Sequence, residues 1–143
     1  MWIIQSLRKE MCPDTPYGDI ASMAENASFK GVFDVDDDRF SAPDSMKEAI
    51  CSWFTERGLA APDTPADYFN SAYVSIAACY NTAIIDLENN TGKTYPYIYI
   101  VGGGAKNNYL NALTESATGK KVVALPIEAT AIGNLKVQME RKA

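Results

Sequence analysis

The stretch "YIYIVGGGAKNNYLNAL" constrains the fold more than any other part of this chain. Aromatic and β-branched residues over 97–101 predict a strand, and three glycines follow it directly. Residues 107–118 have helical spacing, Gly119 turns the chain, and residues 121–125 predict a second strand. A strand–helix–strand unit of this length implies a parallel pair joined by a right-handed crossover. We therefore predict an α/β fold that contains this unit.

The rest of the chain is predicted to be mainly helical. Apolar periodicity and end signals predict further helices over residues 2–11, 17–27, 45–58, 64–92 and 128–140. Ser45 and Glu48 fit a capping box, and Thr64, Pro65 and Asp67 are typical of a helix start.

The longest of these helices carries an apolar stripe that we expect to pack in the core, and its members are Phe69, Ala72, Tyr73, Ile76, Ala77, Tyr80, Ala83, Ile84 and Leu87. We divide the chain into a helical insert region, residues 1–63, and a helix–strand–helix–strand–helix part, residues 64–143.

Composition excludes several classes of function. The formal net charge is −5 and no long basic stretch exists, so nucleic acid and anionic membranes are poor candidate partners. The absence of histidine removes Ser-His-Asp and Cys-His catalysis and histidine-ligated metals from this chain. No signal peptide or transmembrane segment is visible. The apolar helix that begins at Trp2, without a capping residue before it, suggests a piece of a longer chain.

Cys12, Cys51 and Cys79 are widely spaced and form no CxxC pair, so neither a zinc site nor a redox motif is expected. Reduced thiols are typical of a cytoplasmic protein, and we expect that location. In an oxidising setting Cys12 and Cys51 could pair, and the sequence leaves this open. Cys79 lies in a helical pattern and is expected to be a small buried residue.

An acidic run, "DVDDD", lies between Asp34 and Asp38. It lacks the glycine and the distal glutamate of an EF-hand loop, so a solvated surface turn is favoured over a metal site.

The three glycines after the predicted first strand lie where open parallel sheets bind ligands, beyond the carboxyl ends of the strands. Gly102, Gly103 and Gly104 permit positive φ and a close approach of a ligand to the backbone. The helix that starts near Asn107 would offer free N–H groups, and its amide side chain could hydrogen-bond a base or a ribose. This geometry suits a nucleotide. The alternative is a tight turn without a ligand, since the spacing is neither GxGxxG nor a P-loop.

Small residues at the start of the last predicted helix, within "PIEATAIGNLKVQ", favour a second close contact, with either a neighbouring helix or the sheet. Together, "IVGGGAKNNYLNAL" and "TGKKVVALPIEATAIGNLKVQ" resemble the adenosine-binding motif and final helix of the FGGY family of sugar kinases. The rhamnulokinase subfamily is the most similar, and "MWIIQSLRKE", "DDDRFSAPDSMKEAI" and "PADYFNSAYVSIAACY" agree with it. The resemblance spans nearly the whole chain.

The resemblance implies a fragment of the C-terminal actin-like ATPase domain, which is RNase H-like. It implies transfer of the γ-phosphoryl group of ATP to a sugar hydroxyl, here L-rhamnulose, with Mg²⁺. Gly102 and Gly103 would face the phosphates and ribose, Asn107 would reach the adenine side, and Gly104 would shape the turn. Residues 128–133 would pack behind the site.

Such kinases are longer than this chain, and the resemblance places the sugar contacts and the catalytic aspartate in an N-terminal domain outside it. We therefore expect the 143 residues alone to bind nucleotide weakly at best and to lack kinase activity. The first predicted strand would leave an open edge, so we expect self-association through it, or a helix that covers it. Two alternatives remain: a non-catalytic nucleotide-binding or regulatory module of the actin-like ATPases, and a structural α/β domain.

Overall fold

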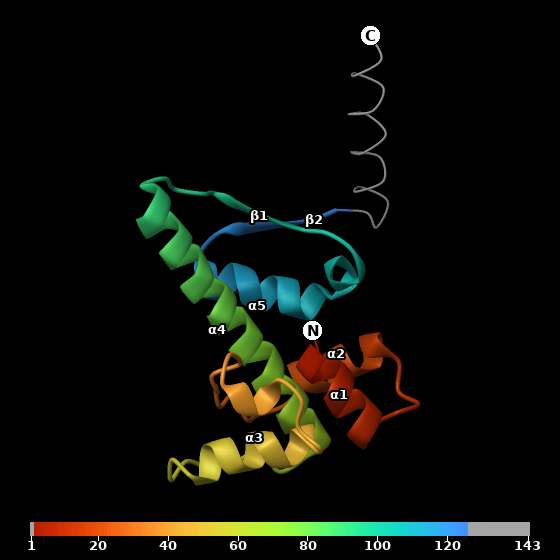
Figure 1. The fold of residues 1–143 in the computed structure, drawn as a ribbon. Helices are drawn as coiled ribbons and strands as arrows, with labels where there is room; N and C mark the ends of the chain where they lie inside the picture. Colours follow the sequence, from red (N-terminus) through yellow and green to blue (C-terminus); the bar gives the residue numbers. More distant parts are fainter. Residues whose placement is uncertain (1, 126–143) are drawn as a thin grey trace, which may run out of the picture.

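A single long helix, α4 (Pro65–Thr91), runs through the molecule and carries the other elements along its length (Figure 1). The structure is a computed structural model that describes residues 2–125. The other helices are α1 (Trp2–Met11), α2 (Tyr17–Glu25), α3 (Met46–Thr55) and α5 (Asn108–Thr118), with short 3-10 helices η1 (Asp38–Phe40) and η2 (Gly103–Lys106). The strands are β1 (Tyr97–Ile100) and β2 (Lys121–Ala124). The helix predicted over residues 128–140, with its small-residue face, lies outside the described residues.

Helix α4 begins and ends where its sequence predicts. The Thr64 hydroxyl accepts a hydrogen bond from the Asp67 N–H at 3.2 Å, and the Asp67 carboxylate accepts one from the Thr64 N–H at 3.1 Å. This reciprocal pair is a capping box, and Pro65 stands at the first helical turn. At the other end Gly92 has a φ of 65°, the left-handed conformation that ends many helices.

Helices α1, α2 and α3 gather around the first half of α4 and form the hydrophobic core with it (Figure 1). Aromatic rings fill the space next to α3, where Phe33 lies within 6.2 Å of both Trp53 and Phe54, measured between ring centroids. Ser45 caps α3 by accepting a bond from the Glu48 N–H, but the Glu48 carboxylate does not bond the Ser45 N–H, so half of the predicted capping box is formed. The Ser45 hydroxyl then donates to the carboxylate of Glu10 in α1, which ties these two helices together.

An extended segment, residues 27–33, crosses α4 without belonging to a sheet. Polar side chains of α4 bond its backbone at alternate residues: Asn70 donates to the Phe29 carbonyl at 2.7 Å, and Ser71 to the Gly31 carbonyl at 2.6 Å. The Ser75 hydroxyl accepts from the N–H of residue 33 at 2.9 Å. Backbone groups that are removed from water need hydrogen-bond partners. The polar side chains of α4 provide these partners here, as a neighbouring strand would in a sheet.

The two strands pair in parallel, as predicted, with Tyr97 opposite Lys121 and Ile100 opposite Ala124. Helix α5 connects them and lies along one side of the pair, against α4 (Figure 1). Within residues 2–125, β1 has β2 as its one hydrogen-bonded neighbour, so its other edge carries no strand there.

The predicted apolar stripe of α4 is correct for its first half and wrong for part of its second half. Phe69, Tyr73 and Ile76 are buried, whereas Ala83 and Leu87 are exposed. The physical reason is that α1, α2 and α3 surround only the beginning of α4. Helix α2 also ends at Glu25, two residues earlier than its apolar pattern predicts.

Candidate functional site

The turn after β1 is built from glycines for two different reasons. Gly102 has φ +81° and ψ −158°, a conformation that a residue with a side chain rarely adopts. Gly103 and Gly104 then begin η2 with ordinary φ values. A Cβ atom added at Gly103 would meet no atom within 4 Å, so protein packing does not account for its missing side chain. The bare backbone at Gly103 faces open space.

That open space is a cavity of about 720 Å³ between the glycine turn and helix α2. Its volume lies within the range of pockets that hold small molecules and cofactors. One wall comes from η2 and the start of α5, and its residues are Gly103, Gly104, Lys106, Asn107, Asn108 and Tyr109. The opposite wall comes from one face of α2, and its residues are Tyr17, Gly18, Ala21, Ser22 and Glu25. Gln5 of α1 lines the remaining part.

Asn107 lines the cavity and also caps α5. Its Oδ1 accepts a hydrogen bond from the Leu110 N–H at 2.9 Å, and its Nδ2 donates to the Tyr73 hydroxyl at 3.0 Å. An amide nitrogen carries two hydrogens, so one donor is left for a ligand. The structure therefore brings Asn107 together with Gly103 and Gly104 around one cavity, whereas Gly102 does not line this cavity.

Two tyrosines hold this wall against α4. The Tyr109 hydroxyl donates to Asn70 Oδ1 at 2.6 Å, and the rings of Tyr73 and Tyr109 meet edge to face with centroids 5.6 Å apart. Burial raises the pKa of both phenols, so both stay protonated at neutral pH. The wall is thus fixed by neutral hydrogen bonds to buried residues of α4.

Sequence reasoning missed the α2 wall and the support by Asn70. The signal for α2 was present, because Gly18, Ala21, Ser22 and Glu25 recur with helical spacing on one face. Nothing in the local pattern of Asn70 shows that it would meet Tyr109, which lies 39 residues further along the chain.

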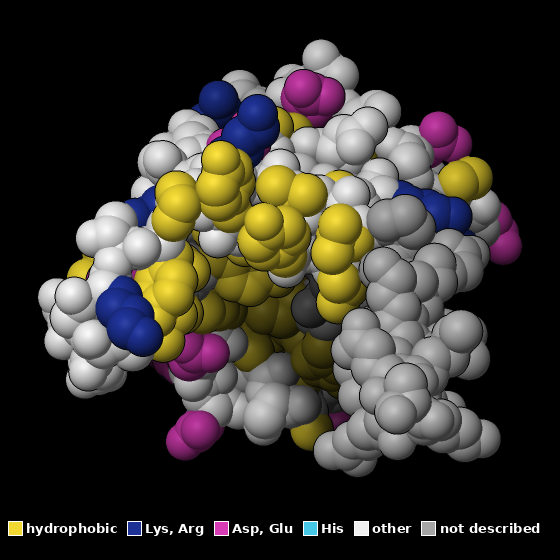
Figure 2. Space-filling view, turned by 90° about the horizontal axis from the view of Figure 1, so that it is seen from above, with side chains coloured by type: hydrophobic (Ala, Val, Ile, Leu, Met, Phe, Trp, Pro, Cys, Tyr) yellow, Lys and Arg dark blue, Asp and Glu magenta, His cyan; other side chains and the backbone are white. Residues whose placement is uncertain are grey.

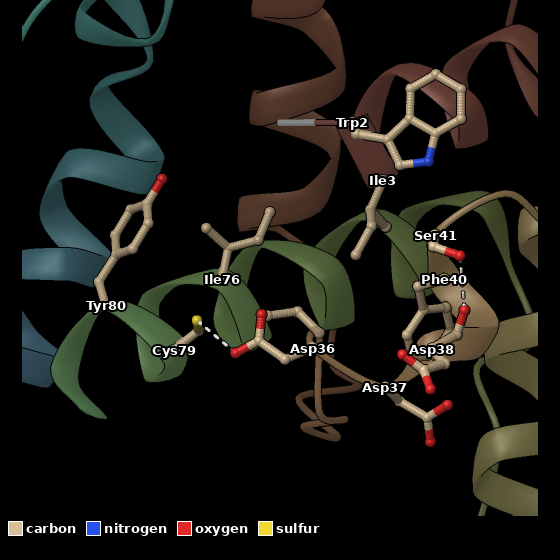
Figure 3. A pocket seen from close by; sticks show the side chains of 11 residues that line it. Trp2, Ile3, Asp36, Asp37, Asp38, Phe40, Ser41, Ile76, Cys79 and Tyr80 are labelled. Carbon is tan, nitrogen blue, oxygen red and sulfur yellow. Dashed lines mark hydrogen bonds between the residues drawn. The ribbon is translucent and has the colours of Figure 1, made fainter. Parts of the chain in front are cut away.

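A second, smaller cavity of about 380 Å³ lies between α1, α4 and the acidic run (Figure 3). The acidic run forms a turn, as predicted: the Asp37 carboxylate caps η1 and pairs with Arg39 at 3.1 Å. A hydrogen bond from the Arg39 backbone N–H is the largest cause that lowers the pKa of Asp37. No group of three or more His, Cys, Asp or Glu side chains within residues 2–125 could hold a metal ion.

All three cysteines are free thiols, and Cys12 and Cys51 do not pair. Cys79 is half-buried, not buried as predicted, and its thiol points to Asp36 Oδ2 at 3.5 Å (Figure 3). Burial, and then the charge of Asp36, raises the pKa of the Cys79 thiol. A raised pKa keeps the thiol protonated and therefore a poor nucleophile.

Comparison with known proteins gives a consistent result. Residues 2–140 match the model described as "FGGY family of carbohydrate kinases, C-terminal domain". The rhamnulokinase of Oceanobacillus iheyensis is 42% identical over 139 residues, which cover 97% of this chain and 30% of that protein. The rhamnulokinases of Halalkalibacterium halodurans and Bacillus subtilis are each 36% identical over 138 and 140 residues, or 96% and 97% of this chain. The chain spans about 30% of the length of these relatives. No helix within the described residues is long and apolar enough to cross a membrane.

Proposed function

The chain belongs to the FGGY family of carbohydrate kinases, as a C-terminal domain close to that of rhamnulokinase, and from this premise we propose that it supplies the adenine-nucleotide wall of a sugar-kinase cleft. The full-length protein would transfer the γ-phosphoryl group of ATP to L-rhamnulose and form L-rhamnulose 1-phosphate. Its domain would have the RNase H-like fold of the actin-like ATPases, of which β1, α5 and β2 are a part. We place this kinase in the cytoplasm, where cysteines stay reduced, and the three cysteines of this chain are free thiols.

The bare backbone of Gly103 beside the cavity is the observation that carries this proposal. ATP binding there needs a surface without side chains and a group that fixes the base. Gly103 would lie along the phosphates and ribose, and Gly104 would shape the turn. The remaining amide hydrogen of Asn107 would point to the adenine side. Gly102, which we also expected to face the phosphates, does not line the cavity, so its part would be to set the backbone that leads into Gly103.

ATP supplies the phosphoryl group, and the residues of this chain bind and orient it. Phosphoryl transfer depends on positioning and on charge stabilisation from both sides of a cleft. The described residues do not fit the Mg²⁺ that such a kinase uses, because no carboxylate cluster faces the glycine turn. We therefore place the metal, the general base and the sugar contacts in the rest of a full-length kinase, and we expect the 143 residues alone to be inactive.

Nucleotide titration of the Gly103→Val variant tests the proposal. A Cβ at Gly103 would meet no atom within 4 Å, so we expect the fold to survive while the side chain excludes ATP. We expect at least a tenfold loss of affinity for a non-hydrolysable ATP analogue, measured by competition with a fluorescent nucleotide. Ala112→Val is the matched control, because Ala112 is exposed on α5 and lies outside the cavity.

An unchanged affinity in Gly103→Val, with both variants folded by circular dichroism, would show that nucleotide does not lie on this turn. A separate assay adds L-rhamnulose and ATP to the 143-residue chain. Measurable L-rhamnulose phosphorylation would refute the expectation that this chain is inactive alone.

A further inference from the structure

The extended segment at residues 27–33 has two edges, and α4 covers one of them. Backbone groups of its odd-numbered residues, from Phe29 to Phe33, bond polar side chains of α4. In an extended chain the backbone groups of successive residues point to opposite sides. The backbone groups of the even-numbered residues therefore point away from α4.

The even-numbered residues form an edge that is open to solvent. Their side chains are exposed at Ser28, Lys30, Val32 and Asp34. Val32 is 45% exposed although it is apolar, so no described element covers this edge. Within residues 2–125, no hydrogen bond engages the N–H or C=O group of Ser28, Lys30 or Val32. Free backbone groups at alternate residues are a surface to which another extended chain can add.

The charges on this edge favour one particular partner. Lys30 and Asp34 carry opposite charges and stand two residues before and two residues after Val32. Four residues of extended chain span about 13 Å, so these two side chains are too far apart to pair with each other. Neither of them forms an ion pair with another described residue. In an antiparallel pair of two identical segments centred on Val32, Lys30 of each copy lies directly opposite Asp34 of the other copy.

We propose that residues 28–34 form a docking edge for a second copy of this chain, which adds as an antiparallel strand around a twofold axis. The two Val32 residues would exchange backbone hydrogen bonds, and Lys30 would exchange them with Asp34 of the second copy. The Asp34 carbonyl accepts a bond from the Asp37 N–H at 3.3 Å, and its second lone pair remains for this contact. Residues directly opposite in such a pair lie on one face, so each dimer would contain two Lys–Asp pairs.

Sedimentation equilibrium of the 143-residue chain and of two charge-reversal variants tests the docking edge. The interface is small, so we expect association at high protein concentration. Lys30→Glu would place two acidic side chains opposite each other at both pairs, and Asp34→Lys would place two basic ones there. We therefore expect each variant alone to associate about tenfold more weakly than the parent. An equimolar mixture of the two variants restores both opposite-charge pairs and should associate about as tightly as the parent.

Lys47→Glu is the matched control, because it makes the same change of charge at an exposed residue of α3 outside the docking edge. Its association should equal that of the parent. If Lys30→Glu associates as this control does, or if the mixture associates no better than either variant with both folded by circular dichroism, the pairing is overturned.

A backbone variant gives a second test that leaves the charges in place. Asp34 also accepts a bond from the Asp36 N–H, whereas no described residue bonds the Val32 N–H. Val32→Pro removes that N–H group, so we expect the fold to remain and the association to be lost. Unchanged association of a folded Val32→Pro variant would overturn the proposal. A parent chain that stays monomeric at all concentrations would overturn it as well.

Discussion

The two ends of helix α4 differ in how completely their apolar surface is covered. At the first end, α1, α2 and α3 enclose the helix, and Phe69, Tyr73 and Ile76 are buried. At the second end, next to the strands, large apolar side chains stay in contact with solvent, and these are Ile85, Leu87, Tyr97, Tyr99 and Val101. Seen from above the strands, apolar side chains gather around a hollow (Figure 2).

Among the described residues, this difference separates a helical part that encloses a core from a sheet part that leaves most of its large apolar residues exposed. Three helices are enough to bury one face of a fourth, because each hides an apolar stripe against the others. A pair of parallel strands is normally buried on both faces and flanked by further strands. Within residues 2–125, the sheet end therefore has less covering structure than the helical end.

The largest expected effect on stability is that of truncating a large side chain at the covered end of α4, compared with the same kind of truncation at the exposed end. Phe69→Ala should lower the free energy of unfolding by about 3–5 kcal/mol, because Phe69 is fully buried. Leu87→Ala should lower it by less than about 1 kcal/mol, because Leu87 is 43% exposed. Urea unfolding followed by circular dichroism measures both. Equal losses would contradict the contrast between the two ends.

A smaller effect comes from the caps of α4. Thr64→Ala should cost about 1 kcal/mol at neutral pH, because it removes the acceptor for the Asp67 N–H. Thr91→Ala, the same substitution at the last residue of α4, should lower the free energy of unfolding by less than about 0.5 kcal/mol. The reason is that the hydrogen bonds of the Thr91 hydroxyl are exposed to solvent. A larger loss for Thr91→Ala than for Thr64→Ala would reverse the expected order.

The loss in Thr64→Ala should also depend on pH. The hydrogen bond from the Thr64 side chain is the largest cause that lowers the pKa of Asp67 below its ordinary value. A lowered pKa stabilises the fold above the unfolded-state pKa of about 3.9, and that contribution is lost as the pH falls through the lower folded value. The difference between parent and variant should therefore be smaller in urea titrations at about pH 3 than at pH 7. A constant difference would show that the Asp67 charge has no part in the cap.

The smallest effect on stability, with a larger one on assembly, is expected at β1. Tyr99→Glu should change the free energy of unfolding by less than about 0.5 kcal/mol, because Tyr99 is 62% exposed. A charge beside a strand edge that no other strand within residues 2–125 pairs with opposes pairing with another chain, so sedimentation should show weaker self-association. Leu59→Glu, at an exposed apolar residue outside the strands, should leave self-association unchanged. A parent chain that is monomeric at all concentrations would contradict the self-association that we expect.

Most elements of this fold were predictable because their signals are local. The Thr64–Asp67 capping box, the left-handed Gly92 and the two strands beside the glycines all follow from neighbouring residues. Burial was less predictable, because the periodicity of α4 continues past Ile76 although the covering helices stop there. Apolar spacing shows which face of a helix could be buried, whereas contacts between distant segments decide whether it is.

The same distinction applies to the candidate site. The conformation of Gly102 and the helix start at Asn107 were predictable from the strand–glycine–helix order. The α2 wall was not, since its place opposite Gly103 depends on how α2 and α5 both pack on α4. The ligand roles of Gly102, Gly103, Gly104 and Asn107 remain predictions.

Helix α4 fixes the width of the cavity although none of the described lining residues belongs to it. Asn70 holds Tyr109, Tyr73 holds Asn107, and α2 packs on the same helix. The contacts of both walls with α4 therefore determine the separation of the walls in the absence of a ligand. Substitutions of Asn70 or Tyr73 would then change the affinity for the proposed nucleotide, although neither residue lines the cavity.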